Sequence, residues 1–185
     1  MKNYCSDSIS DFQNETDYEV VKIKKNKAIC VQCEKATESK AETGVPIAVI
    51  SCEGACLQGE ISRRVANNIC FSEIPEQSFR ICLGGAFTKD TNQRKLVRNS
   101  QRVFVLEGCG ISCSSRMMKG VIPDLQCVII FVNNYYKVDN NKFSIKDLPE
   151  EEIQQISNQA TEEILEEINK SKGYTEEIPN FNCCS

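Results

Sequence analysis

The chain has 185 residues, 41% of them hydrophobic, and a formal net charge of −4, so it can bury a core but lacks the basic excess that nucleic acid attracts. It has 12 cysteines and no histidine, which excludes Cys–His catalysis within the chain and limits zinc ligands to Cys, Asp and Glu. No apolar run reaches the roughly 18 residues of a membrane span, and residues 1–10 lack the apolar core of a secretion signal, so we expect a cytoplasmic protein with reduced thiols and no membrane attachment.

The first 44 residues divide into two regions. Residues 1–17 form a polar tail, and residues 18–44 are expected to hold a β-hairpin followed by a charged linker. The hairpin turns at the lysine-rich stretch 24–27 and ends in Cys30-Val-Gln-Cys33. Two intervening residues are the spacing of a zinc knuckle or of a redox dithiol.

Residues 45–136 alternate between short apolar runs and helical patterns. Strands are expected at 47–50, 79–83, 102–106 and 125–131, and helices at 58–70, 91–99 and 112–119. This alternation predicts right-handed βαβ units. The expected fold is therefore α/β, with a small doubly wound, mostly parallel sheet and helices on both faces.

Residues 137–185 form an acidic C-terminal region. A helix is expected from Pro149 to about Lys170, with an apolar stripe that packs on or near the core. A partner-binding role for its acidic face is the alternative, supported only by charge and amphipathicity. The region ends in an adjacent cysteine pair, Cys183 and Cys184.

Five cysteines are expected at one edge of the sheet. Cys52 and Cys56 follow the first strand, Cys109 and Cys113 follow the third, and Cys82 lies near the end of the second. Thiols at a helix N-terminus are shifted toward thiolate by its exposed N–H groups. Because neighbouring strands lie about 4.8 Å apart, thiolates at their ends can share one soft metal ion. The pattern predicts a site for Zn²⁺, or alternatively for an iron–sulfur cluster.

Weaker candidates for a second metal site lie toward the chain ends: Cys30, Cys33, Cys183 and Cys184, with Cys5 as a further ligand. The Cys30–Cys33 pair can instead reach the core site and act as a lid. Cys70 and Cys127 fall on apolar faces of an expected helix and strand, so we expect both to be packing residues.

Two glutamates flank the first cysteine of each core pair. Glu53 follows Cys52, and Glu107 stands two residues before Cys109. Either can serve as a general acid–base or as a support for a metal ligand. Capping of helix N-termini, where negative charge is favoured, is the preferred interpretation.

Four stretches of the core resemble the DGC-domain family, whose Asp-Gly-Cys motif is followed by a Cys four residues on. They are Ile47 to Cys52-Glu-Gly54, Gly59 to Ala66, Cys82-Leu-Gly-Gly85, and Glu107-Gly108-Cys109 with Cys113. The resemblance covers about residues 47–131 and implies zinc binding by Cys52, Cys82, Cys109 and Cys113. The chain departs from the family in having Glu107 for the Asp, and Cys56 where a small residue without a thiol is expected.

The sequence therefore predicts a metal-binding protein, with its biological role and any enzymatic activity left open. Four thiolates would close the shell of a zinc ion and leave no position for hydrolysis. The alternative is a thiol-based redox, sulfur-transfer or metalloid-handling protein that uses surplus thiols such as Cys56. The expected partner is a metal ion, and a homodimer or a protein partner is left open.

Overall fold

The computed structural model describes residues 18–139 and 141–171, and its centre is a four-stranded sheet. The strands are β1 (Ile47–Ser51), β2 (Ser78–Arg80), β3 (Arg102–Glu107) and β4 (Val128–Phe131). They lie in the order β2-β1-β3-β4, and every pair is parallel. The loops that follow β1 and β3 lead to helices on opposite faces, which makes the gap between their carboxyl ends a topological switch point, where such sheets place ligands.

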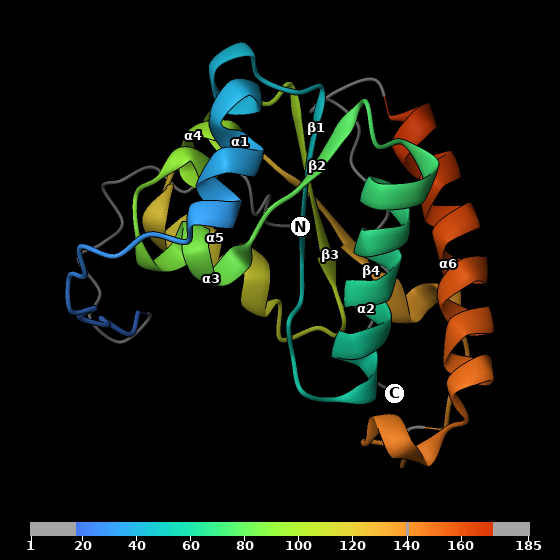
Figure 1. Cartoon of the computed structure of the whole chain (residues 1–185). Coiled ribbons are helices and arrows are strands. Elements are labelled where there is room, and N and C mark those ends of the chain that lie inside the picture. Colours follow the sequence, from blue (N-terminus) through green and yellow to red (C-terminus); the bar gives the residue numbers. More distant parts are fainter. Residues whose placement is uncertain (1–17, 140, 172–185) are drawn as a thin grey trace, which may run out of the picture.

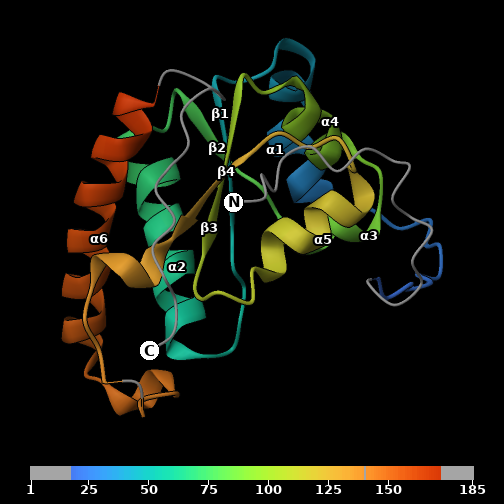
Figure 2. The same ribbon diagram turned by 180° about the vertical axis from the view of Figure 1, so that it is seen from behind.

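Helices cover both faces of the sheet, as the sequence predicts. In Figure 1, α2 (Leu57–Asn68) and α6 (Glu150–Lys170) lie on one face. The other face carries α1 (Val31–Thr43), α3 (Leu83–Thr88), α4 (Asn92–Asn99) and α5 (Cys113–Val121). Figure 2 shows the same two layers from behind. The α/β class and the parallel sheet are confirmed.

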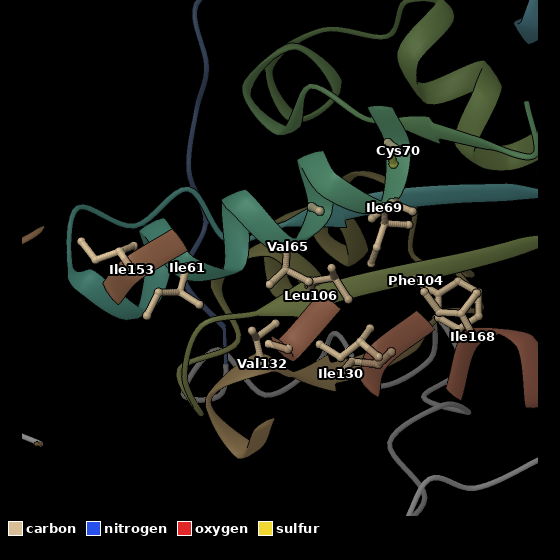
Figure 3. Close-up of a cluster of buried hydrophobic side chains, with 14 of the residues drawn as sticks. Ile61, Val65, Ile69, Cys70, Phe104, Leu106, Ile130, Val132, Ile153 and Ile168 are labelled. Atoms are coloured by element: carbon tan, nitrogen blue, oxygen red, sulfur yellow. The ribbon is translucent and has the colours of Figure 1, made fainter. Parts of the chain in front are cut away.

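The apolar stripe of α6 packs on the core. Figure 3 shows Ile153 and Ile168 of α6 together with Val65 of α2 and Phe104 and Leu106 of β3. All five side chains are at most 1% exposed. Burying each large apolar side chain stabilises the fold by about 1.5–3 kcal/mol. The terminal helix is therefore an integral layer of the domain.

A second apolar cluster fills the opposite face. It joins Ala41 of α1, Leu96 of α4, Val103 of β3 and Met118 of α5. Cys127 belongs to this cluster and Cys70 to the other, at 7% and 4% exposure. The expectation that these two cysteines are packing residues agrees with their burial.

The predicted N-terminal hairpin is wrong. Residues 18–30 contain no strand, and α1 occupies Val31–Thr43, where the end of the hairpin and a charged linker were expected. The segment Glu34–Glu42 is rich in Ala, Glu and Lys, which favour a helix, whereas a two-stranded hairpin has little apolar surface to bury. The sequence also missed α3, because Gly84-Gly85 suggested only the end of a strand. The short β2 ends at Arg80, before Cys82.

Some predictions lie outside the described residues, among them the polar tail 1–17 and the candidate ligands Cys5, Cys183 and Cys184. Within the described residues, no helix has the length and apolar character needed to cross a membrane.

Candidate metal centre and its thiols

Cys52 lies directly beyond β1 and is 5% exposed. Its N–H donates to the Leu106 carbonyl at 2.8 Å, which continues the β1–β3 ladder past the strand end. The Gly54 N–H donates to Cys52 Sγ at 3.4 Å, and the Gly108 N–H also bonds this sulfur. Burial raises the pKa of Cys52, although the two N–H groups oppose the rise. A bound cation would let this thiol ionise, and the two donors would then stabilise the thiolate.

Glycines bring the turns after β1 and β3 into direct contact. A Cβ on Gly108 would lie 2.8 Å from the Gln58 carbonyl oxygen, and one on Gly59 would lie 2.5 Å from the Gly54 carbonyl oxygen. Both obstacles are backbone atoms, so neither can swing aside. These glycines let the first turn of α2 pack between the two cysteine-bearing turns.

Cys56 and Cys109 lie close to Tyr136. Cys56 is the N-cap of α2, and the sulfurs of Cys52 and Cys56 lie 3.3 and 3.8 Å from the position of a Cβ on Gly54. Burial raises the pKa of Tyr136, and the charges of Cys56 and Cys109 raise it further. The Tyr136 hydroxyl is buried and has no hydrogen-bond partner among the described residues. An unpaired buried O–H near two cysteines is placed to donate a hydrogen bond to either sulfur when that sulfur is a thiolate.

Cys113 is the first residue of α5, and Glu107 caps that helix. Glu107 is 1% exposed and accepts hydrogen bonds from the N–H groups of Ser115 at 2.7 Å and Ser114 at 3.4 Å. Capping is therefore confirmed for Glu107. The Ser114 hydroxyl, next to Cys113, is a second buried group without a partner in the described part of the chain. Cys113 also lies close enough to Cys52 for its charge to raise the pKa of that thiol.

Glu53 has a different role. Its carboxylate forms an ion pair with Arg80, whose guanidinium also binds Ser51 Oγ and donates to the Ile81 carbonyl at 2.7 Å. The capping predicted for Glu53 is thus replaced by an ion pair. The sequence analysis did not identify Arg80 as the partner of Glu53, although Arg80 stands only two residues before the candidate ligand Cys82. It also missed Tyr136, for which the sequence offers no motif.

Cys82 contacts the Cys30-x-x-Cys33 pair. It is the exposed N-cap of α3, and its N–H donates to Gln93 Oε1 at 2.9 Å. The Cys33 thiol is hydrogen-bonded to both Cys30 and Cys82, and these bonds together with burial raise its pKa to about 12. Hydrogen bonds from the backbone and side chain of Cys33 lower the pKa of Cys30.

Apart from the packing residues Cys70 and Cys127, the described cysteines form two groups. The switch-point thiols are Cys52, Cys56, Cys109 and Cys113, and the α1–α3 thiols are Cys30, Cys33 and Cys82. None of the nine described cysteines is in a disulfide. In the described ranges, no three Cys, Asp or Glu side chains are arranged so that they could hold a metal ion as they stand. The donor set of the first group nevertheless fits a soft metal, because thiols, N–H groups and unpartnered hydroxyls lie together there.

A family model described as the DGC domain matches residues 48–161. The match extends past the cysteine-bearing turns to include Tyr136 and the first half of α6. No curated protein and no solved structure matches the chain.

Proposed function

Because the chain belongs to the DGC-domain family, we propose that it binds a zinc ion through thiolates at the switch point between β1 and β3. Cys52, Cys109 and Cys113 are three of the proposed ligands, and they follow the adjacent strands β1 and β3. Zinc in proteins accepts Cys sulfur at about 2.3 Å, usually from four ligands in a structural site.

The proposal rests on the hydrogen-bond donors that lie close to these sulfur atoms. Cys52 Sγ accepts two backbone N–H groups, from Gly54 and Gly108. The Tyr136 hydroxyl is buried near Cys56 and Cys109 and has no hydrogen-bond partner among the described residues. Buried donors left unpaired cost about 1–3 kcal/mol each, so a fold that keeps one beside thiols is suited to thiolate acceptors.

We propose Cys56 as the fourth ligand. Its sulfur shares the space beside Gly54 with that of Cys52, and it flanks Tyr136 together with Cys109. Cys82, the fourth cysteine implied by the family resemblance, contacts Cys33 instead. Cys82 is the competing candidate, and one pair of variants separates the two.

A shell of four thiolates has no open position, so the proposed role is structural or metal-handling rather than hydrolytic. When bound, the metal would supply the positive charge that offsets the burial of Cys52. The chain's own contribution is to hold the thiols at two strand ends and to donate N–H and O–H groups to them.

The test is metal content by elemental analysis of full-length protein purified without oxygen. We expect about one zinc per chain, lost in Cys109→Ser and Cys56→Ser and retained in Cys82→Ser. Cys70→Ala, a change in the packed core, is the control and should keep its zinc. Retention in Cys109→Ser would overturn the site, and loss in Cys82→Ser with retention in Cys56→Ser would replace the fourth ligand. Iron with bound sulfide and a brown colour would instead favour the iron–sulfur alternative.

A further inference from the structure

Three thiols meet where the N-termini of α1 and α3 come together, away from the switch point. Cys30 is the N-cap of α1, Cys33 lies in its first turn, and Cys82 is the N-cap of α3. The Cys33 thiol interacts with those of both Cys30 and Cys82. The arrangement is a chain of sulfur contacts rather than a single cysteine.

Two contacts hold the segment in this place. Lys89 Nζ, beyond the end of α3, donates to the carbonyls of Lys27 and Ala28 at 3.2 and 3.0 Å, just before Cys30. At the other end of α1, Asn99 Nδ2 donates to the Ala41 carbonyl at 2.9 Å, and Ala41 is fully buried against α4. The pair of cysteines is therefore anchored on both sides of the first turn of α1.

Cys30 and Cys33 differ in solvent exposure. Thiol exchange requires such a difference, because one thiol must reach the substrate and the other must reach its partner thiol. Cys30 is exposed and can meet a substrate, whereas Cys33 is partly covered and can meet Cys30. Cys30 Sγ donates to Gln32 Oε1 at 3.7 Å, within the same first turn of α1 that carries Cys33. The exposed N–H groups of a helix N-terminus stabilise a sulfur placed there as an attacking or leaving thiolate.

We propose that Cys30 and Cys33 form a dithiol–disulfide exchange site that reduces disulfide substrates, with Cys82 as a third thiol that contacts Cys33. This activity uses other residues than the metal site and does not depend on it. A substrate of this class presents an accessible disulfide bond, as low-molecular-weight disulfides and exposed protein disulfides do.

The exchange proceeds in two balanced steps. The Cys30 thiolate attacks one sulfur of the substrate R–S–S–R, a Cys30–S–R bond forms, and R–S⁻ leaves and takes up a proton. The Cys33 thiolate then attacks Cys30 Sγ, and the second R–SH leaves. Two electrons pass to the substrate, and both thiol protons of the pair end on R–SH. An external dithiol restores Cys30 and Cys33 by the same exchange in reverse.

The test uses reduced full-length protein, oxidised glutathione as the probe, and mass spectrometry of intact protein and peptides. We expect wild-type protein to form a Cys30–Cys33 disulfide, to retain no glutathione on this pair and to release two molecules of glutathione. Cys33→Ser cannot complete the second step, so it should accumulate one glutathione on Cys30. Cys30→Ser should form no disulfide at this pair and react at α1 at least about ten-fold more slowly. Cys70→Ala, a buried packing change, should behave as wild type.

Two results would overturn the proposal. One is glutathione that stays on Cys30 of the wild-type protein, and the other is a Cys33→Ser variant that fails to accumulate the mixed disulfide. The zinc content of the same samples should equal that of wild type, so a failure at this site is distinguishable from a failure of the metal proposal.

Discussion

The switch-point thiols and the α1–α3 thiols are positioned by different means. The first group follows two neighbouring parallel strands, β1 and β3, and its turns are locked together by backbone contacts at Gly59 and Gly108. The second group depends on a helix that docks on the sheet from a distant part of the sequence and is held by side-chain bonds such as that of Lys89. The comparison shows that backbone contacts fix the turns of the first group, whereas side-chain hydrogen bonds hold the segment of the second. This difference matches the metal-binding role proposed for the first group and the exchange role proposed for the second.

The largest loss of stability is expected from adding a side chain where the turns after β1 and β3 touch. Gly108→Ala would place a Cβ 2.8 Å from the Gln58 carbonyl oxygen, so the turn after β3 must move. We expect a loss of about 1–3 kcal/mol of unfolding free energy, measured by urea denaturation. Gly84→Ala in α3 is the matched control, because a Cβ there meets no atom within 4 Å. Equal destabilisation by both changes would remove the claimed difference between the two regions.

A smaller loss is expected at the cap of α5. Glu107→Gln keeps one acceptor but removes the charge that faces two N–H groups of the first turn. Because a charged acceptor at a helix N-terminus is lost, we expect about 1 kcal/mol of destabilisation in the same assay. Glu38→Gln, on the exposed surface of α1, should change the unfolding free energy by less than about 0.5 kcal/mol. An unchanged stability in Glu107→Gln would contradict the capping role.

The smallest effect on stability is expected at two carboxylates, Glu60 and Asp90, that form ion pairs with arginines. Burial raises the pKa of Glu60 in α2, but hydrogen bonds from Arg63 and Arg64 outweigh it and lower the pKa below its usual 4.5. Hydrogen bonds from Arg98 likewise lower the pKa of Asp90, which follows α3. Since both values are depressed in the folded state, each contribution is present above the unfolded pKa and is lost as the pH falls through the folded pKa.

Glu60→Gln should therefore cost about 0.5–1 kcal/mol at pH 7, and Asp90→Asn, in a more exposed pair, less than about 0.5 kcal/mol. Urea midpoints measured from pH 7 down to pH 3 check both the size and the sign. The gap between each variant and wild type should close as the pH falls. A gap that widens toward acid would contradict the assigned pKa directions.

The sequence predicted the structure best where a strand, a turn and a helix follow one another directly along the chain. The apolar runs at 47–50 and 102–106, each followed by a glycine-containing turn and a cysteine pair, predicted β1, β3 and the helices that follow them. The capping role of Glu107 also followed from its place beside a helix start. These features depend on neighbours within about ten residues, and short-range patterns carry that information.

The remaining features depend on contacts between distant segments. The segment before Cys30 alternates weakly, so a hairpin was expected, yet the Ala-, Glu- and Lys-rich stretch 34–42 forms α1. The contact of Cys33 with Cys82 follows from the docking of α1 beside α3, which no spacing rule encodes. Tyr136 reaches Cys56 and Cys109 only because β4 lies next to β3.

The most direct test of the account is differential alkylation of zinc-loaded and chelator-treated protein, with each cysteine followed by mass spectrometry. We predict that zinc protects Cys52, Cys56, Cys109 and Cys113, and that chelation exposes them to the reagent. Cys30, Cys33 and Cys82 should react at the same rate in both samples. Zinc protection of any α1–α3 thiol, or no change at the switch-point thiols, would contradict the division into two groups.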